Sequence, residues 1–126
     1  MPHTVTYNSE THIVETKAHG NLTLDEAKEL IFDIGRVCAE KNCFLCLSDY
    51  REVILKLSTL DIYSIPHLLS DILASMGLPA NKVKRAVVVA KDIRDFEFFE
   101  TVTINSGQSI KLFQDIDEAK QWLLEK

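Results

Sequence analysis

The clearest pattern along the chain is a helical repeat of apolar side chains between residues 23 and 41. Thr23 precedes this repeat and Glu26 follows three residues later, which is the capping-box sequence of a helix N-terminus. The repeat predicts an amphipathic helix with one buried face. Its apolar positions are Leu24, Ala27, Leu30, Ile31, Ile34, Val37 and Cys38.

Short apolar or β-branched runs elsewhere predict strands. The first two runs are separated by a polar turn and indicate a hairpin, which Gly20 and Asn21 end. The third and fourth are continuous apolar runs, typical of strands covered on both faces. Residues 50–57 are expected to form an irregular connection. The predicted strands are residues 4–7, 12–18, 44–47, 85–90 and 110–113.

Three further helices follow from capping signals and apolar spacing. Residues 58–61 (Ser-Thr-Leu-Asp) predict the start of a helix that reaches Met76. A kink or break is expected at Pro66, because proline lacks an N–H and disfavours helical geometry at the preceding residue. Residues 93–105 predict an aromatic-rich helix, and Asp115 is expected to cap the last one.

Strands and helices therefore alternate from end to end, which is typical of the α/β class. We predict a single domain over residues 1–126 with a mixed, mostly parallel sheet of about five strands. Helices are expected on both faces of this sheet. The N-terminal strand is expected to be an antiparallel edge strand.

Composition narrows the function classes. The net charge is −5 and the pI is near 5.3, which argues against a general nucleic-acid binder. The basic cluster Lys82, Lys84 and Arg85 is interpreted as the solvated lead-in to a strand. The first residues lack the basic and apolar regions of a signal peptide, and no run approaches the ~18 apolar residues of a membrane helix. A cytoplasmic protein without a transmembrane segment is expected.

Motifs for metal, cofactor or nucleophilic chemistry are weak. Cys43-x-x-Cys46 lies at the start of a predicted strand rather than of a helix, and its odd spacing is expected to send the two thiols to opposite faces. A buried structural role is the preferred interpretation. With Cys38 the cysteine count is odd, which indicates reduced thiols. We expect no metal, no cofactor and no enzymatic activity.

Four segments carry a resemblance to a known family. The closing segment is the most specific, because a strand leads into a capped helix that contains Trp122 and Leu123. These segments are residues 12–29, 43–49, 85–89 and 113–123. Over nearly its whole length the chain resembles the SpoIIAA-like family, also called the STAS/Sec14-type domain.

The resemblance implies a mixed sheet with four βα units wound as a superhelix, and two kinds of role. Antagonists of anti-sigma factors in this family bind a partner protein. They are switched by phosphorylation of a Ser or Thr at the start of the helix after the third strand. Sec14-type relatives bind lipids or other apolar ligands. Because one fold can host many functions, the resemblance suggests each of these roles only by analogy.

The carboxyl ends of the parallel strands are the expected ligand-binding edge of such a sheet. The candidate binding residues there are His19, Asp49, Tyr50, Arg51 and Lys91. His19 and Asp49 are also considered as an acid–base pair. The alternative is that this edge is polar only because turns and helix caps need polar residues.

Ser58 and Thr59 complete the candidate binding residues, at the start of the helix after the third strand. Ser58 is the candidate phosphorylation site, since a helix N-terminus favours a phosphate. The sequence departs from the family's Asp-Ser-Ser-Gly pattern because the glycine is missing. Simple N-capping by Ser58, worth ~1 kcal/mol, is the alternative.

The apolar faces of helices 58–76 and 93–105 look wider than one sheet face requires. The surplus indicates a ligand groove or a homodimer face, with core burial as the alternative. Two functions follow. The first is a non-enzymatic regulatory or protein-interaction module working near residues 49–61. The second is a carrier or sensor of a small apolar (lipid-like) or acidic ligand.

Overall fold

The computed structural model describes residues 1–90 and 94–125. Within them, the strands form one five-stranded sheet in the order β1-β2-β3-β4-β5. β1 is antiparallel to β2, and the other neighbouring pairs are parallel. The strands are β1 (His3–Asn8), β2 (Ile13–Leu22), β3 (Leu45–Leu55), β4 (Lys84–Val88) and β5 (Ser109–Phe113). The predicted α/β class and the antiparallel edge strand are confirmed.

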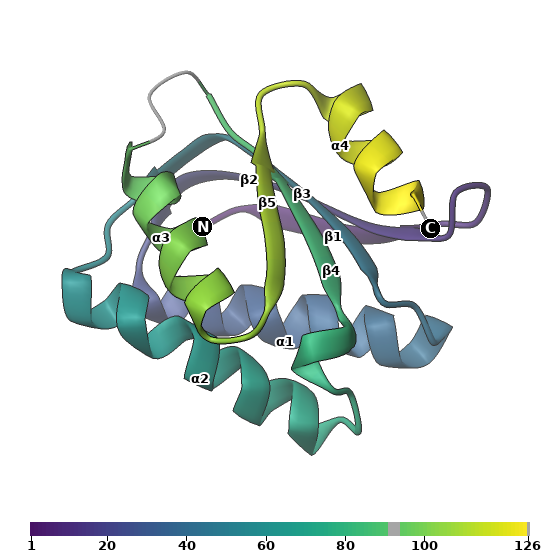
Figure 1. Cartoon of the computed structure of the whole chain (residues 1–126), viewed down its shortest axis with the longest axis horizontal. Helices are drawn as coiled ribbons and strands as arrows, with labels where there is room; N and C mark the ends of the chain where they lie inside the picture. Colours follow the sequence, from purple (N-terminus) through teal and green to yellow (C-terminus); the bar gives the residue numbers. More distant parts are fainter. Residues whose placement is uncertain (91–93, 126) are drawn as a thin grey trace.

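The helices are distributed unequally over the two faces of the sheet (Figure 1). α1, α2 and α3 cover one face and meet the larger core cluster, whereas α4 covers the other face and a smaller one. Helices on both faces are therefore confirmed. The helices are α1 (Leu24–Lys41), α2 (Thr59–Ser75), the short 3-10 helix η1 (Ala80–Lys82), α3 (Arg94–Asn105) and α4 (Ile116–Leu124).

The expectation of an irregular connection over residues 50–57 is wrong for residues 50–55, which belong to β3, and right only for Lys56 and Leu57. β3 continues to Leu55, because β2 also runs on past Ala18 and offers it backbone partners. The two strands pair from Val14 with Cys46 to Leu22 with Leu55, with a register shift between Lys17 and His19. Gly20 does not end β2 but lies within it at a φ of +98°, a value that glycine adopts without steric cost.

The helix ends follow the predicted capping signals. The Thr23 hydroxyl accepts a hydrogen bond from the Glu26 N–H at the start of α1, although the Glu26 carboxylate pairs with the amino group of Met1 instead of completing the box. At α2 the box is complete, with Ser58 and Asp61 bonded reciprocally. The break expected at Pro66 is absent from α2, which is one continuous helix.

Candidate functional site

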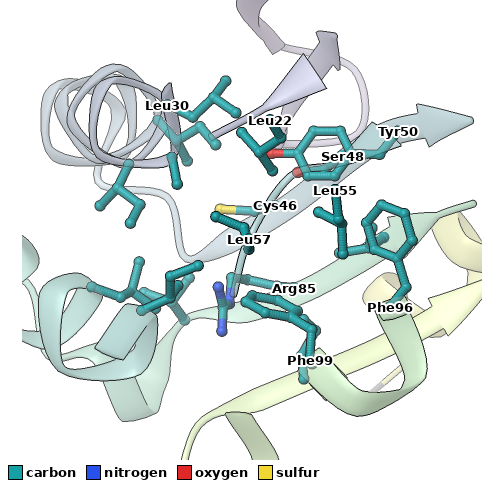
Figure 2. A pocket seen from close by; sticks show the side chains of 18 of the residues that line it. Leu22, Leu30, Cys46, Ser48, Tyr50, Leu55, Leu57, Arg85, Phe96 and Phe99 are labelled. Atoms are coloured by element: carbon teal, nitrogen blue, oxygen red, sulfur yellow. The ribbon is translucent and has the colours of Figure 1, made fainter. Parts of the chain in front are cut away.

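A cavity of about 90 Å³ lies between the sheet and the three helices α1, α2 and α3 (Figure 2). One water needs roughly 10–15 Å³ of such volume, so the space exceeds an ordinary packing defect. Most of the wall is aliphatic or aromatic. It is lined by Leu22, Ala27, Leu30, Ile31, Ile34, Cys38, Cys46, Ser48, Tyr50, Leu55, Leu57, Ile65, Leu69, Leu73, Val83, Arg85, Val87, Phe96, Phe99 and Ile110.

The sheet side of the cavity follows from strand alternation. Successive side chains of a strand point to opposite faces, so Cys46, Ser48 and Tyr50 of β3 share the face that α1, α2 and α3 cover. On β4 the same alternation turns Arg85 toward the cavity and Lys84 toward α4. The Lys84 ammonium lies 4.3 Å from the centre of the Trp122 ring.

Arg85 is the cationic side chain of the cavity, and its interpretation as a solvated strand lead-in is wrong. In the sheet register it lies between Cys46 of β3 and Ile110 of β5, so it occupies an inner row of the sheet. Burial lowers the pKa of its guanidinium from the ordinary value. Arginine nevertheless keeps its charge in proteins. The cavity therefore holds a fixed positive charge.

The buried Gln108 holds Arg85 in position. Arg85 Nη2 donates to Gln108 Oε1 at 3.2 Å. Gln108 Nε2 in turn donates to the Pro66 carbonyl at 2.8 Å and to Ser70 Oγ at 3.1 Å, both on α2. The guanidinium is thereby tied to a helix on the opposite wall through one fixed amide.

Tyr50 and Ser48 add hydroxyl groups to the same wall. Burial raises the pKa of the Tyr50 hydroxyl, while the neighbouring Ser48 hydroxyl opposes this shift. In Figure 2 the two side chains lie beside each other near Leu22, on the β3 side of the cavity. Tyr50 is the member of the sequence-predicted binding set that lines the cavity.

Two cysteine thiols also meet at this wall. Cys38 Sγ of α1 and Cys46 Sγ of β3 are 3.5 Å apart, and both thiols are free. This contact lowers the pKa of Cys38 and, together with burial, raises the pKa of Cys46 well above its ordinary value. The strand-alternation argument does not apply to Cys43, because it precedes β3 and packs in the same core cluster as Cys46.

The remaining candidates at the sheet edge do not converge. Asp49 and Arg51 point to the face opposite Tyr50, where Arg51 Nη2 donates to Asp49 Oδ2 at 2.7 Å and Nε donates to Oδ1 at 2.9 Å. This pairing holds the pKa of Asp49 below its ordinary value. The exposed His19 lies opposite Glu52 in the register, so the proposed pair with Asp49 is not formed. Lys91 lies outside the described residues.

Ser58 and Thr59 are exposed at the start of α2, away from the cavity lining. Ser58 Oγ accepts from the Asp61 N–H at 3.1 Å, and its own N–H donates to Asp61 Oδ2 at 3.0 Å. The capping role is thus present. Whether Ser58 is also phosphorylated stays a prediction.

The wide apolar faces of α2 and α3 divide between the cavity and the surface. Ile65, Leu69 and Phe99 line the cavity. Tyr63 and Phe98 are exposed and meet edge to face, with ring centres 5.7 Å apart. Part of the surplus apolar surface predicted from the sequence therefore lines a cavity, and both the ligand groove and the homodimer face stay predictions.

Sequence reasoning missed Arg85 and Gln108 as site residues. One signal was present: Arg85 shares the strand parity of Val87 and Val89, which pack in the helix-covered core. Gln108 offered no signal, because its place depends on contacts with α2.

Comparisons with known proteins do not assign the chain to a family. No family model, curated protein or solved structure matches the chain. The resemblance to the SpoIIAA-like family therefore stays a prediction. No helix in the described part of the chain has the length and apolar character to cross a membrane. The described residues also contain no cluster of histidine, cysteine and acidic side chains fit to hold a metal ion.

Proposed function

We propose that the protein binds a small, largely apolar ligand in the cavity beneath α1, α2 and α3, and acts as a carrier or sensor rather than as an enzyme. The observation that carries this proposal is the cavity itself, because protein interiors are otherwise close-packed. Concave, mostly apolar sites with a few placed polar groups are the usual form of small-molecule sites.

The dimensions of the cavity favour a small ligand. Its volume of about 90 Å³ is below the roughly 300 Å³ at which sites for drug-sized ligands begin. The aromatic rings of Phe96 and Phe99 and the aliphatic side chains of α1 and α2 offer contact to a hydrocarbon chain. We therefore expect a compact molecule with a short apolar part.

The test uses short-chain probes and a cavity-filling variant. Hexanoate and hexan-1-ol are titrated into the protein while backbone amide NMR signals are followed. We expect at least one probe to shift the signals of cavity residues. Ala27→Leu adds three carbons inside the cavity and should weaken binding of every probe at least tenfold.

A matched control is the same substitution on the other face of the sheet. Ala119 of α4 is fully buried in the smaller core cluster and does not line the cavity. Ala119→Leu should leave probe affinity unchanged in whatever fraction of the protein is folded. The proposal fails if neither probe shifts cavity signals, or if Ala27→Leu binds as well as the wild type.

A regulatory or partner-binding role is the second candidate, and the exposed start of α2 favours it. Ser58 is accessible, and Leu60 beside it is 80% exposed. The test is intact-mass and native mass spectrometry of protein purified from its own host. Phosphate mapped to Ser58, with a change in subunit number in Ser58→Ala, would support this role. An unmodified protein with the same subunit number in Ser58→Ala would contradict it.

A further inference from the structure

Building on the proposed binding function, we propose that the ligand is a monovalent organic anion, foremost a short-chain carboxylate. Its head group pairs with the Arg85 guanidinium, and its hydrocarbon chain lies against the apolar wall formed by α1, α2 and α3 (Figure 2). This assigns a charge and a head group to a ligand that the cavity alone defines only as small and apolar.

The first argument is that the hydrogen-bonding capacity of Arg85 is mostly unused. A guanidinium carries five N–H donors, and among the residues that the structure describes this one has a single acceptor, Gln108 Oε1. Among the described residues no carboxylate pairs with Arg85, since the ion pairs found there involve other groups. A bound carboxylate would accept two parallel hydrogen bonds from such a fork.

The second argument is the setting of this charge. Arg85 is partly buried on a central strand between Cys46 and Ile110, and Figure 2 shows its guanidinium beside the ring of Phe99 and near Leu57. Charged groups are rarely placed against apolar walls unless they are paired, because removing them from water is costly. An anionic ligand supplies the pairing that the described part of the protein does not.

The third argument fixes the valence of the anion. Among the described residues that line the cavity, Arg85 is the cationic side chain, and no second lysine or arginine accompanies it. One cation balances a carboxylate or a sulfonate, whereas a phosphate monoester carries about −1.5 to −2 charges at neutral pH. The planar carboxylate also matches the guanidinium fork in shape.

The experiment compares matched probes in calorimetric titrations near neutral pH. Hexanoate, hexan-1-ol, hexane-1-sulfonate and hexyl phosphate share one hydrocarbon chain and differ in the head group. We expect hexanoate to bind at least tenfold more tightly than hexan-1-ol, because hydrogen bonds between charged groups are stronger than those to a neutral hydroxyl. Hexyl phosphate should bind more weakly than hexanoate. Each methylene from butanoate to hexanoate should add about fourfold in affinity.

Arg85→Met is the decisive variant, because it keeps the bulk of the side chain and removes the charge. It should abolish the preference for hexanoate over hexan-1-ol, with a much larger loss of affinity for hexanoate than for hexan-1-ol. Arg85→Lys should keep part of the preference. Arg51→Met, on the opposite face of the sheet, is the matched control and should keep all of it.

The outcomes separate the two proposals. If hexan-1-ol binds as tightly as hexanoate, or Arg85→Met and Arg85→Lys both keep the carboxylate preference, the anion inference is overturned while the apolar cavity site stands. If hexyl phosphate binds most tightly, the monovalent assignment is overturned. If no probe binds in the cavity, both proposals fail together.

Discussion

Arg85 and Gln108 are joined by a 3.2 Å hydrogen bond between Nη2 and Oε1, and the same glutamine amide donates to the Pro66 carbonyl of α2. The proline lies within a continuous helix, and its carbonyl is bonded by a residue 42 positions away in the sequence. This chain of contacts holds the cavity's cation between strand and helix.

Gln108→Leu should therefore disturb both stability and selectivity. Removing the amide leaves the Arg85 donor without its acceptor, and we expect the free energy of unfolding to fall by about 1–3 kcal/mol. The ratio of hexanoate to hexan-1-ol affinity should also fall several-fold, because the guanidinium is no longer fixed. If the variant is less stable but keeps this affinity ratio, Gln108 contributes to stability and does not position Arg85 for binding.

Arg85→Met should stabilise the ligand-free protein. Arg85 is a partly buried cation at an apolar wall, and removing its charge relieves a desolvation cost that we expect to exceed the loss of its one hydrogen bond to the buried Gln108. We expect the free energy of unfolding in urea to rise by about 1 kcal/mol or more. A fall would mean that Arg85 contributes to stability, and would weaken the functional interpretation of its position.

Two alanines should respond in opposite ways to the same substitution. Ala27→Leu fills existing space, and we expect stability to rise by about 0.5–2 kcal/mol, as cavity-filling changes commonly do. Ala119→Leu forces extra carbons into the closed cluster beneath α4, and should cost about 1–3 kcal/mol. Thermal or urea unfolding measures both. Equal destabilisation of the two would contradict the cavity.

Cysteine modification should report on cavity occupancy. The contact with Cys46 lowers the pKa of Cys38, so at mildly alkaline pH Cys38 holds the larger thiolate fraction of the two. Methyl methanethiosulfonate should modify Cys38 before Cys46, as peptide mass mapping will show. Bound hexanoate should slow this reaction several-fold. The control is Cys43, which does not line the cavity and whose rate should not depend on hexanoate.

The Asp49–Arg51 pair should make the free energy of unfolding depend on pH in the acidic range. The hydrogen bonds from Arg51 lower the folded-state pKa of Asp49, so the pair stabilises the protein above the unfolded-state pKa of about 3.9. This contribution is lost as the pH falls through the folded-state pKa. The stability difference between wild type and Asp49→Asn should therefore shrink between pH 5 and about pH 2. Urea unfolding across this range measures it, and a difference independent of pH would contradict the assignment.

Much of the fold could be predicted from local patterns. The helix over residues 24–41, its Thr23 cap and the Ser58 capping box all depend on residues close in sequence. The alternation of elements predicted the parallel sheet with an antiparallel edge. The extension of β3 to Leu55 could not be predicted in this way, because residues 50–55 gain their strand geometry from pairing with β2.

The candidate site was predicted only in outline. The expected polar edge of the sheet contains Tyr50, but Asp49 and Arg51 turn to the opposite face, because neighbouring residues of a strand alternate. The wide apolar faces of α2 and α3 indicated surplus surface without showing where it would lie.

The sequence by itself determined the order of strands and helices, their caps and the absence of familiar chemical motifs, since these depend on neighbouring residues. The tertiary structure alone decided that Arg85 faces a cavity rather than solvent. That outcome depends on its register between Cys46 and Ile110, and on three helices that cover one face of the sheet. How far a charged side chain is buried depends on what surrounds it, and around the partly buried Arg85 those surroundings come from distant parts of the chain.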